Sequence, residues 1–112
     1  MLSKSYRLTQ EKDFRRISVS GKSFFSHLFR LRLAKNSLKI SRFAVVVSAK
    51  VSKKAVERNR LKRQLREIIR LNLGKIKGGY DISLSPNSRA VGVDYQDLEI
   101  EVLKLFSKAR LV

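Results

Sequence analysis

The segment from residue 50 to residue 70 combines the apolar spacing of a helix with a high density of positive charge. It reads KVSKKAVERNRLKRQLREIIR, with nine Lys or Arg and only two acids. At about 100° per residue, one side of a helix gathers the apolar residues Leu61, Leu65, Ile68 and Ile69. The opposite side gathers Asn59, Arg63, Arg66 and Arg70. Such a helix packs one face on a core and shows solvent a cationic row, which suits a polyphosphate better than a small substrate.

The whole chain shares this positive charge. Its 112 residues hold 26 Lys or Arg against 9 Asp or Glu, a formal net charge of +17. A field of that sign attracts polyanions, so nucleic acid is the first expected partner and an anionic membrane surface the second. The hydrophobic share of 43% argues against wholesale disorder. We expect one domain over residues 1–112, with residues 1–7 flexible.

Two absences narrow the setting of the chain. There is no cysteine, which removes disulfides and thiolate chemistry and fits a cytoplasmic location. No apolar run approaches the roughly 18 residues of a membrane span, and no secretion signal is recognisable at the N-terminus.

The pattern along the chain predicts an α+β fold, a two-layer α/β sandwich with the order α-β-β-α-β-α. Thr9 is the expected cap of a helix over about 10–19, which Gly21 ends. A strand over 24–33 and a polar connection at 35–37 lead to a central strand over 42–49, buried on both faces. Further expected elements are a helix over 53–73 capped by Ser52, a strand over 80–84 stopped by Pro86, and a last helix capped by Asp94 with Asp97 three residues on.

The side chains are poorly supplied for bond breaking. His27 is the only histidine, so an acid–base pair on imidazoles is missing, and a structural role for it is favoured. Asp94, Asp97 and Glu101 share a helical face, but favourable charge near a helix N-terminus explains them better than a metal site does. No phosphate-binding glycine loop or hydrolase nucleophile motif is present.

Binding is better supplied than catalysis. A basic helix is often only a solvated face, but here acids are nearly absent, so ion pairs within the helix are not expected to neutralise it. Arg58 projects toward the apolar side, at the rim where helix meets sheet. The phenylalanines are expected in the core, except that Phe14, among basic neighbours, is a candidate for stacking on an unpaired base. Arg30 and Arg32 point from the strand face opposite Phe29, so a basic groove with an aromatic wall is expected between that face and the first helix.

At Arg58-Asn59-Arg60 the sequence resembles a known family. The stretch VSAKVSKKAVERNRLKRQLRE is similar to the signature of the bacterial ribonuclease P protein subunit. RLTQEKDFRRI with the following Gly21-Lys22 resembles the family's first helix and turn, and Tyr80-Asp81-Ile82 with the closing helix resembles its C-terminal half. The resemblance covers nearly the whole chain.

The resemblance implies a non-catalytic subunit of a ribonucleoprotein endonuclease. Its catalytic RNA carries the active site and the Mg²⁺ ions and removes 5′ leaders from precursor tRNA, with no obligate protein partner and no membrane. It also implies a left-handed β-α-β crossover. The residues expected to bind the catalytic RNA are Lys53, Lys54, Arg58, Asn59, Arg60, Lys62, Arg63, Arg66 and Arg70. Those expected in the leader-binding cleft are Lys12, Phe14, Arg30, Arg32 and Lys50.

Two positions depart from the family pattern. Ser18 stands where members often carry a second aromatic, and Ala49 stands where many carry a lysine. Both departures imply a weaker grip on the leader. The alternatives are a ribosomal or RNA-chaperone protein without a processing role and, less favoured, a membrane-binding amphipathic protein.

Overall fold

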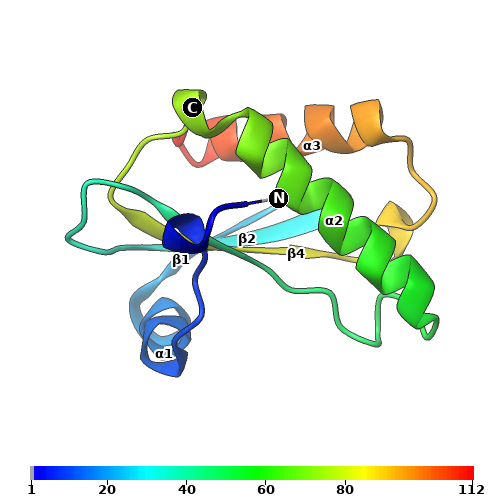
Figure 1. Cartoon of the computed structure of the whole chain (residues 1–112), viewed down its shortest axis with the longest axis horizontal. Helices are drawn as coiled ribbons and strands as arrows, with labels where there is room; N and C mark the ends of the chain where they lie inside the picture. Colours follow the sequence, from blue (N-terminus) through cyan, green and yellow to red (C-terminus); the bar gives the residue numbers. More distant parts are fainter. Residues whose placement is uncertain (1) are drawn as a thin grey trace.

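The computed structural model describes residues 2–112 (Figure 1). The α-helices are α1 (Glu11–Ser20), α2 (Ala55–Leu71) and α3 (Tyr95–Lys108). The strands are β1 (Lys22–Phe25), β2 (Phe29–Lys35), β3 (Arg42–Val45) and β4 (Tyr80–Pro86). Short 3-10 turns are η1 (Lys4–Tyr6), η2 (Leu73–Lys75) and η3 (Ser88–Ala90). The α+β class is confirmed, and none of the helices in this part of the chain has both the length and the apolarity to span a bilayer.

The strands form one sheet in the order β1-β2-β4-β3. β1, β2 and β4 are antiparallel neighbours, whereas β3 and β4 run parallel and are joined through α2. The prediction of a single strand over 24–33 is therefore wrong, because the chain turns at 26–28 and β1 and β2 form a hairpin. The Ser26 hydroxyl oxygen stabilises that turn by accepting a hydrogen bond from the Phe29 backbone N–H at 3.1 Å.

β3 is an edge strand, not the doubly buried central strand predicted over 42–49. β4 takes the place between β2 and β3, a pairing between residues some 40 positions apart that local periodicity does not reveal. Phe43 and Val45 face the main core, and Ala44 faces the opposite side of the sheet. Val46, beyond the strand, is 43% exposed. The β-branched composition of residues 42–49 thus predicted a strand correctly, but it did not predict the position of that strand in the sheet.

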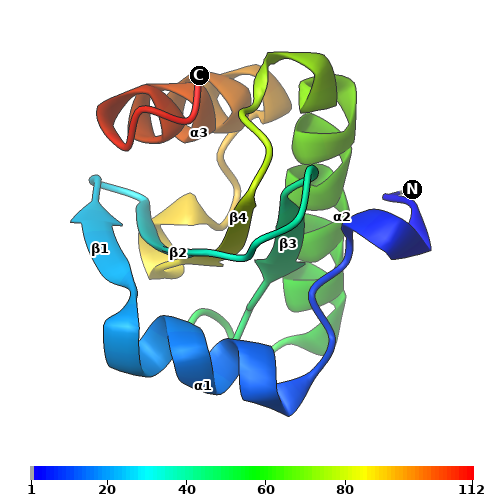
Figure 2. The ribbon, with the colours of Figure 1, turned by 90° about the vertical axis from the view of Figure 1, so that its left-hand side faces the viewer.

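The main core lies between one face of the sheet and the pair α2 and α3 (Figure 1). Phe29, Leu31 and Leu33 of β2 enter it at every second residue, as a strand with one covered face requires. The helix α1 lies on the opposite face of the sheet, over a small cluster built on Leu8, Ile17 and Ala34 (Figure 2). The helices therefore leave part of that second face open.

The helix ends differ slightly from the prediction. α2 begins at Ala55, with Lys54 rather than Ser52 at the N-cap position. Ser52 instead caps the preceding turn, since its hydroxyl oxygen accepts a hydrogen bond from the Lys54 backbone N–H at 3.1 Å. Asp94 does precede α3, but its side chain makes no capping hydrogen bond. Gly21 does follow α1, and its N–H donates to the Ile17 carbonyl at 2.9 Å.

Residues 1–7 were expected to be flexible; residue 1 lies outside the described residues, and residues 2–7 are packed on the domain. Leu2 is buried in the main core, and the Arg7 Nε donates to the Leu2 carbonyl at 2.9 Å. The backbone N–H of Leu8 donates to the Phe43 carbonyl at 2.8 Å. The polar composition of this stretch concealed the anchoring role of buried Leu2 and of Leu8, which follows it.

Candidate nucleic-acid interface

The outer face of α2 is basic because the opposite face is anchored in the core. Leu61, Leu65, Ile68 and Ile69 are all buried, which fixes the rotation of the helix about its axis. Asn59, Arg60 and Arg63 are consequently exposed, and within residues 2–112 neither arginine forms an ion pair. Lys53 and Lys54 are exposed just before the helix, and Lys62 is half-buried on its flank. The structure thus groups these cations on one surface.

Arg58 is occupied by the fold. Its Nη1 donates to the Ser52 carbonyl at 2.8 Å, and the Ser52 hydroxyl donates to a Glu57 carboxylate oxygen at 2.6 Å. These bonds fix the turn that presents the first residues of α2. Arg58 is half-buried at this junction, so it positions the exposed Asn59 and Arg60 beside it.

The predicted cationic row is shorter than the sequence suggested. Arg70 pairs with Glu67, and its Nε donates to the Glu67 Oε2 at 3.0 Å. The hydrogen bond from Arg70 lowers the pKa of Glu67, so the carboxylate stays charged and offsets the guanidinium. Arg66 turns away from the row and lines a hollow of about 150 Å³ with Phe14 and Val46. The expectation that no ion pair would neutralise this helix is therefore wrong at Arg70.

A second cationic surface lies on the open face of the sheet. Arg30 pairs in register with Ser85, and Arg32 with Ser83, so these four side chains share the face on which α1 lies. The Nε of Arg32 is buried and has no hydrogen-bond partner in the described part of the chain. Phe25, opposite Arg30 in β1, is 60% exposed. This face therefore presents a hydrogen-bond donor that has no partner within the described residues, together with an exposed aromatic ring.

The other residues expected in the leader-binding cleft do not all meet. Phe14 packs beside the small cluster under α1 and faces the Arg66 hollow. Lys12 lies on the other side of α1 and lines a hollow with Asn36 and Arg42. Lys50 is exposed in the turn before α2. The structure therefore brings Phe14 to the α2 side of the cleft and separates Lys12 from it.

Phe25 was expected in the core and is not. Phe29, Phe43 and Phe106 are buried, as the sequence predicted. Phe25 projects from the opposite side of β1 to Phe24, because successive residues of a strand alternate between faces. The missed signal is the hairpin itself, which resets the register at residues 26–28.

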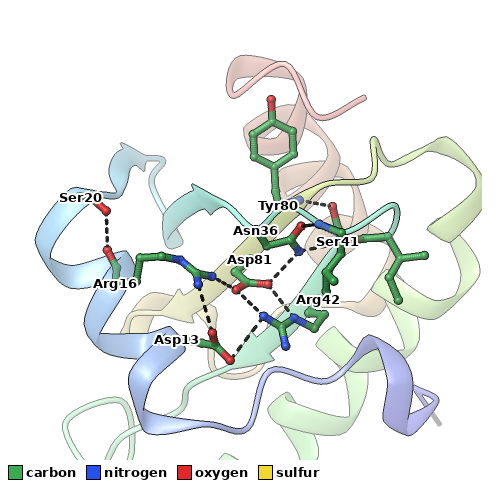
Figure 3. Close-up of polar contacts among 10 residues, drawn as sticks. Asp13, Arg16, Ser20, Asn36, Ser41, Arg42, Tyr80 and Asp81 are labelled. Atoms are coloured by element: carbon green, nitrogen blue, oxygen red, sulfur yellow. Dashed lines mark hydrogen bonds and ion pairs between the residues drawn. The ribbon is translucent and has the colours of Figure 1, made fainter.

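A cluster of charges that the sequence did not reveal holds α1 on the sheet (Figure 3). Asp81 of β4 is fully buried and lies against two guanidinium groups. Arg42 grips both of its oxygens, with Nε to Oδ1 at 2.9 Å and Nη2 to Oδ2 at 2.8 Å. Arg16 of α1 donates to the same carboxylate. Arg16 is half-buried at this helix–sheet contact.

Two further groups complete this cluster. Asp13 of α1 accepts from Arg16 at 3.2 Å and pairs with Arg42 at 3.4 Å. Asn36 donates from Nδ2 to Asp81 Oδ1 at 3.0 Å and to the Ile40 carbonyl at 3.1 Å. The hydrogen bond to Asp81 raises the pKa of Arg42, so the guanidinium remains charged. The two carboxylates of the cluster thus balance its two guanidinium groups, and their contacts hold α1 to β3, β4 and the loop after β2.

The groups weighed for catalysis are dispersed. His27 is exposed in the β1–β2 turn, and its backbone carbonyl accepts from the Asn87 Nδ2 at 2.8 Å. Glu101 pairs with Lys104 at 3.9 Å instead of joining Asp94 and Asp97. Across residues 2–112, no three His, Asp or Glu side chains are placed to hold a metal ion together.

Comparison with known proteins agrees with the geometry. The family model Ribonuclease P matches residues 2–110. The ribonuclease P protein component of Clostridium botulinum (strain Loch Maree / Type A3) is 39% identical over 107 residues, covering 95% of this chain and 96% of that protein. That of Synechocystis sp. (strain ATCC 27184 / PCC 6803 / Kazusa) is 38% identical over 112 residues, covering 99% and 90%.

Solved structures show the same fold. The RNase P protein from Thermotoga maritima superposes with a TM-score of 0.84 at 36% identity, covering 91% of this chain and 96% of that one. The Staphylococcus aureus RNase P protein gives a TM-score of 0.87 at 26% identity, covering 96% and 98%. Since family model, sequence and fold all agree over nearly the full length, this chain belongs to the ribonuclease P protein component family.

Proposed function

We propose that this chain is the RNA-binding protein subunit of a ribonuclease P ribonucleoprotein, which removes the 5′ leader from precursor tRNA. The observation that carries the proposal is the outer face of α2, where Asn59, Arg60 and Arg63 are exposed opposite a buried seam. In this proposal the partners are the catalytic RNA and precursor tRNA, no further protein is required, and the complex works in the cytoplasm.

The face of α2 is the docking surface for the catalytic RNA. Each guanidinium that meets a phosphate releases condensed counterions, so binding is strong at low salt and weakens steeply as salt rises. Because the turn before α2 is fixed by Arg58, Ser52 and Glu57, the exposed side chains are presented on a rigid helix end. A rigid surface loses less entropy on binding than a flexible basic tail does.

The open face of the sheet is the surface for the single-stranded leader. Arg30 and Arg32 supply phosphate donors, and the unpartnered Nε of Arg32 gives one donor a fixed direction. Phe25 offers a stacking surface beside them, and Phe14 supports the other side of the cleft under α1. Phe25 thereby provides on β1 an aromatic that Ser18 does not provide on α1.

The reaction itself is assigned to the RNA. Mg²⁺-dependent cleavage by the RNA would leave a 5′-phosphate on the mature tRNA, and the protein would reduce repulsion between two polyanions and hold the leader in position.

Reconstitution tests the proposal. Purified protein alone is expected not to cleave precursor tRNA, and its addition to the cognate catalytic RNA is expected to restore cleavage at low Mg²⁺. Robust cleavage by the protein alone would contradict the proposal, and so would an RNA whose activity at low Mg²⁺ the protein leaves unchanged. Recovery of mainly ribosomal RNA in a pull-down would favour a ribosomal or chaperone role instead.

The docking face has its own test. Arg60→Ala and Arg63→Ala should each weaken binding to the catalytic RNA and reduce the slope of log K against log salt by about 1. Arg15→Ala is a matched control, because Arg15 is exposed on α1 and paired with Glu11 at 3.2 Å. Equal slopes in all three variants would show that α2 is not the phosphate-contacting face.

A further inference from the structure

A groove of about 700 Å³ opens at the end of the sheet where α1 and α3 both end. α2 and α3 both run across the molecule toward this end (Figure 1). The groove is therefore near their C-terminal ends and far from the first turns of α2. Its volume falls in the range of about 300–1,000 Å³ that holds drug-sized ligands. A groove of this size accommodates a nucleotide or two of a single strand but not a double helix.

The walls of the groove are cationic and contain no acid. Its basic lining residues are Lys22, Lys35, Lys77, Lys108 and Arg110. Within residues 2–112 none of the five forms an ion pair. Like charges that surround one hollow repel one another, so an anion bound there relieves the repulsion.

Two aromatic side chains add a second signal. Phe24 and Tyr80 line the same groove and pack against the main core with part of each ring left exposed. Figure 3 shows the Tyr80 ring pointing away from the charge cluster around Asp81. Cations along a groove together with aromatic faces are what single-stranded nucleic acid requires, because phosphates meet the charges and bases stack on the rings.

The groove is continuous with the open face of the sheet around one strand. Lys22 and Phe24 of β1 face the groove, whereas Ser23 and Phe25 face Arg32 and Arg30 on the open side. β1 is the edge strand on the side of the sheet opposite β3, and it lies between α1 and α3 (Figure 2). The Lys108 Nζ also donates to the Phe25 carbonyl at 3.3 Å, so it borders both surfaces. A strand on the open face therefore reaches the groove by crossing β1 alone.

We infer that this groove binds the 5′-distal nucleotides of a single-stranded leader whose nearer nucleotides lie on the open face of the sheet. The inference rests on the proposed function, because it assigns the strand to precursor tRNA. It adds a second contact region and makes binding depend on leader length.

The experiment measures binding of the free protein to fluorescent oligouridylates of about four and about twelve nucleotides, which span the usual site sizes for single strands. Wild-type protein should bind the longer probe about tenfold more tightly than the shorter one. Lys22→Gln combined with Lys77→Gln should reduce this gain to within about twofold, and should lower the salt slope for the longer probe by about 1.4, or about 0.7 per phosphate. Binding of the shorter probe should not change.

The control removes equal charge elsewhere. Lys4→Gln combined with Lys75→Gln changes two exposed lysines that do not line the groove, and it should preserve the length-dependent gain. If both double variants reduce the gain equally, the effect is general electrostatics and the inference fails. It also fails if the groove variant weakens binding of the catalytic RNA while leaving the longer probe unaffected.

Crosslinking locates the strand directly. A 4-thiouridine at the 5′ end of the longer probe should crosslink to peptides that contain Phe24 or Tyr80, and crosslinks confined to α2 would overturn the assignment. Reconstituted cleavage separates the two hypotheses. If the groove idea alone is wrong, the wild-type protein still stimulates cleavage by the catalytic RNA, whereas failure of that stimulation refutes the proposed function itself.

Discussion

The charge cluster around Asp81 predicts a large and specific effect of a single isosteric change. Asp81→Asn removes the central carboxylate and leaves the guanidiniums of Arg16 and Arg42 with Asp13 as their only acid. Removing one partner of a buried ion pair costs about 3–5 kcal/mol, because the other charge stays in the interior without compensation. Here the side chains of Arg16 and Arg42 are 38% and 22% exposed, so water compensates in part. We therefore expect a loss of about 2–3 kcal/mol of unfolding free energy.

Urea unfolding followed by circular dichroism measures this loss. In thermal unfolding, a loss of this size should lower the Tm by about 10 °C, given an unfolding entropy of roughly 2.1 cal/mol/K per residue. Glu11→Gln is the matched control, since it breaks the pair with Arg15 whose side chains are 72% and 87% exposed. If Asp81→Asn destabilises the protein no more than Glu11→Gln does, the cluster is not what holds α1 to the sheet.

The same variant has a functional consequence. Because Arg16 and Asp13 are the contacts of α1 with this cluster, their release loosens the helix that borders the cleft. Binding of a single-stranded oligouridylate should weaken, whereas binding of the catalytic RNA through α2 should stay within about twofold. Equal losses on both ligands would indicate global unfolding instead of a displaced α1.

Three further predictions follow from local contacts. Gly21→Ala should cost about 1–3 kcal/mol in urea unfolding, because an added Cβ would lie 2.2 Å from the Ile17 carbonyl oxygen; Gly74→Ala, with nothing within 4 Å, should leave stability nearly unchanged. Burial first, and then the negative charges of Glu99 and Glu67, raise the pKa of Tyr95 above its ordinary 10.0. The ionisation of Tyr95, seen as the part of the 295 nm absorbance change that Tyr95→Phe removes, should therefore occur above pH 10, and a transition below pH 10 would contradict this. The free energy of unfolding contributed by the neutral phenol should be complete below pH 10 and should be lost as the pH rises through the pKa of Tyr95 in the folded protein. Arg32→Gln should reduce oligouridylate affinity more than Lys39→Gln, which changes an exposed lysine that does not line the groove, and equal effects would argue against a directed donor.

Local periodicity accounts for what the sequence predicted well. The buried seam of α2 at Leu61 and Leu65 depends on residues one turn apart, so the face that remains exposed follows directly from the spacing. The exposure of Asn59, Arg60 and Arg63 was predictable for the same reason. The pairing of Arg70 with Glu67 is equally local, because residues three apart are neighbours on a helix surface, so the sequence spacing already contains it.

What the sequence did not predict depends on distant residues. β4 lies between β2 and β3, and nothing near residues 42–49 indicates that its neighbour comes from residues 80–86. Arg16 and Asp81 are 65 residues apart, so an amphipathic reading of α1 leaves Arg16 in solvent. The groove around Lys22 and Lys108 likewise forms only when the ends of α1 and α3 meet the edge of the sheet.

The short segment before α1 has a consequence for solubility. β3 pairs with β4 on one side only, and its other edge is met by the bridge from Arg7 and by the Leu8 N–H. Edge strands with unpaired backbone groups invite pairing with another chain, and the run Val45–Val46–Val47 has the β-branched composition that favours it. Buried Leu2 fastens this cover to the core. Residues 2–8 thus cover the sheet edge, and their removal should make the domain self-associate through β3, which size-exclusion chromatography would detect as a larger species.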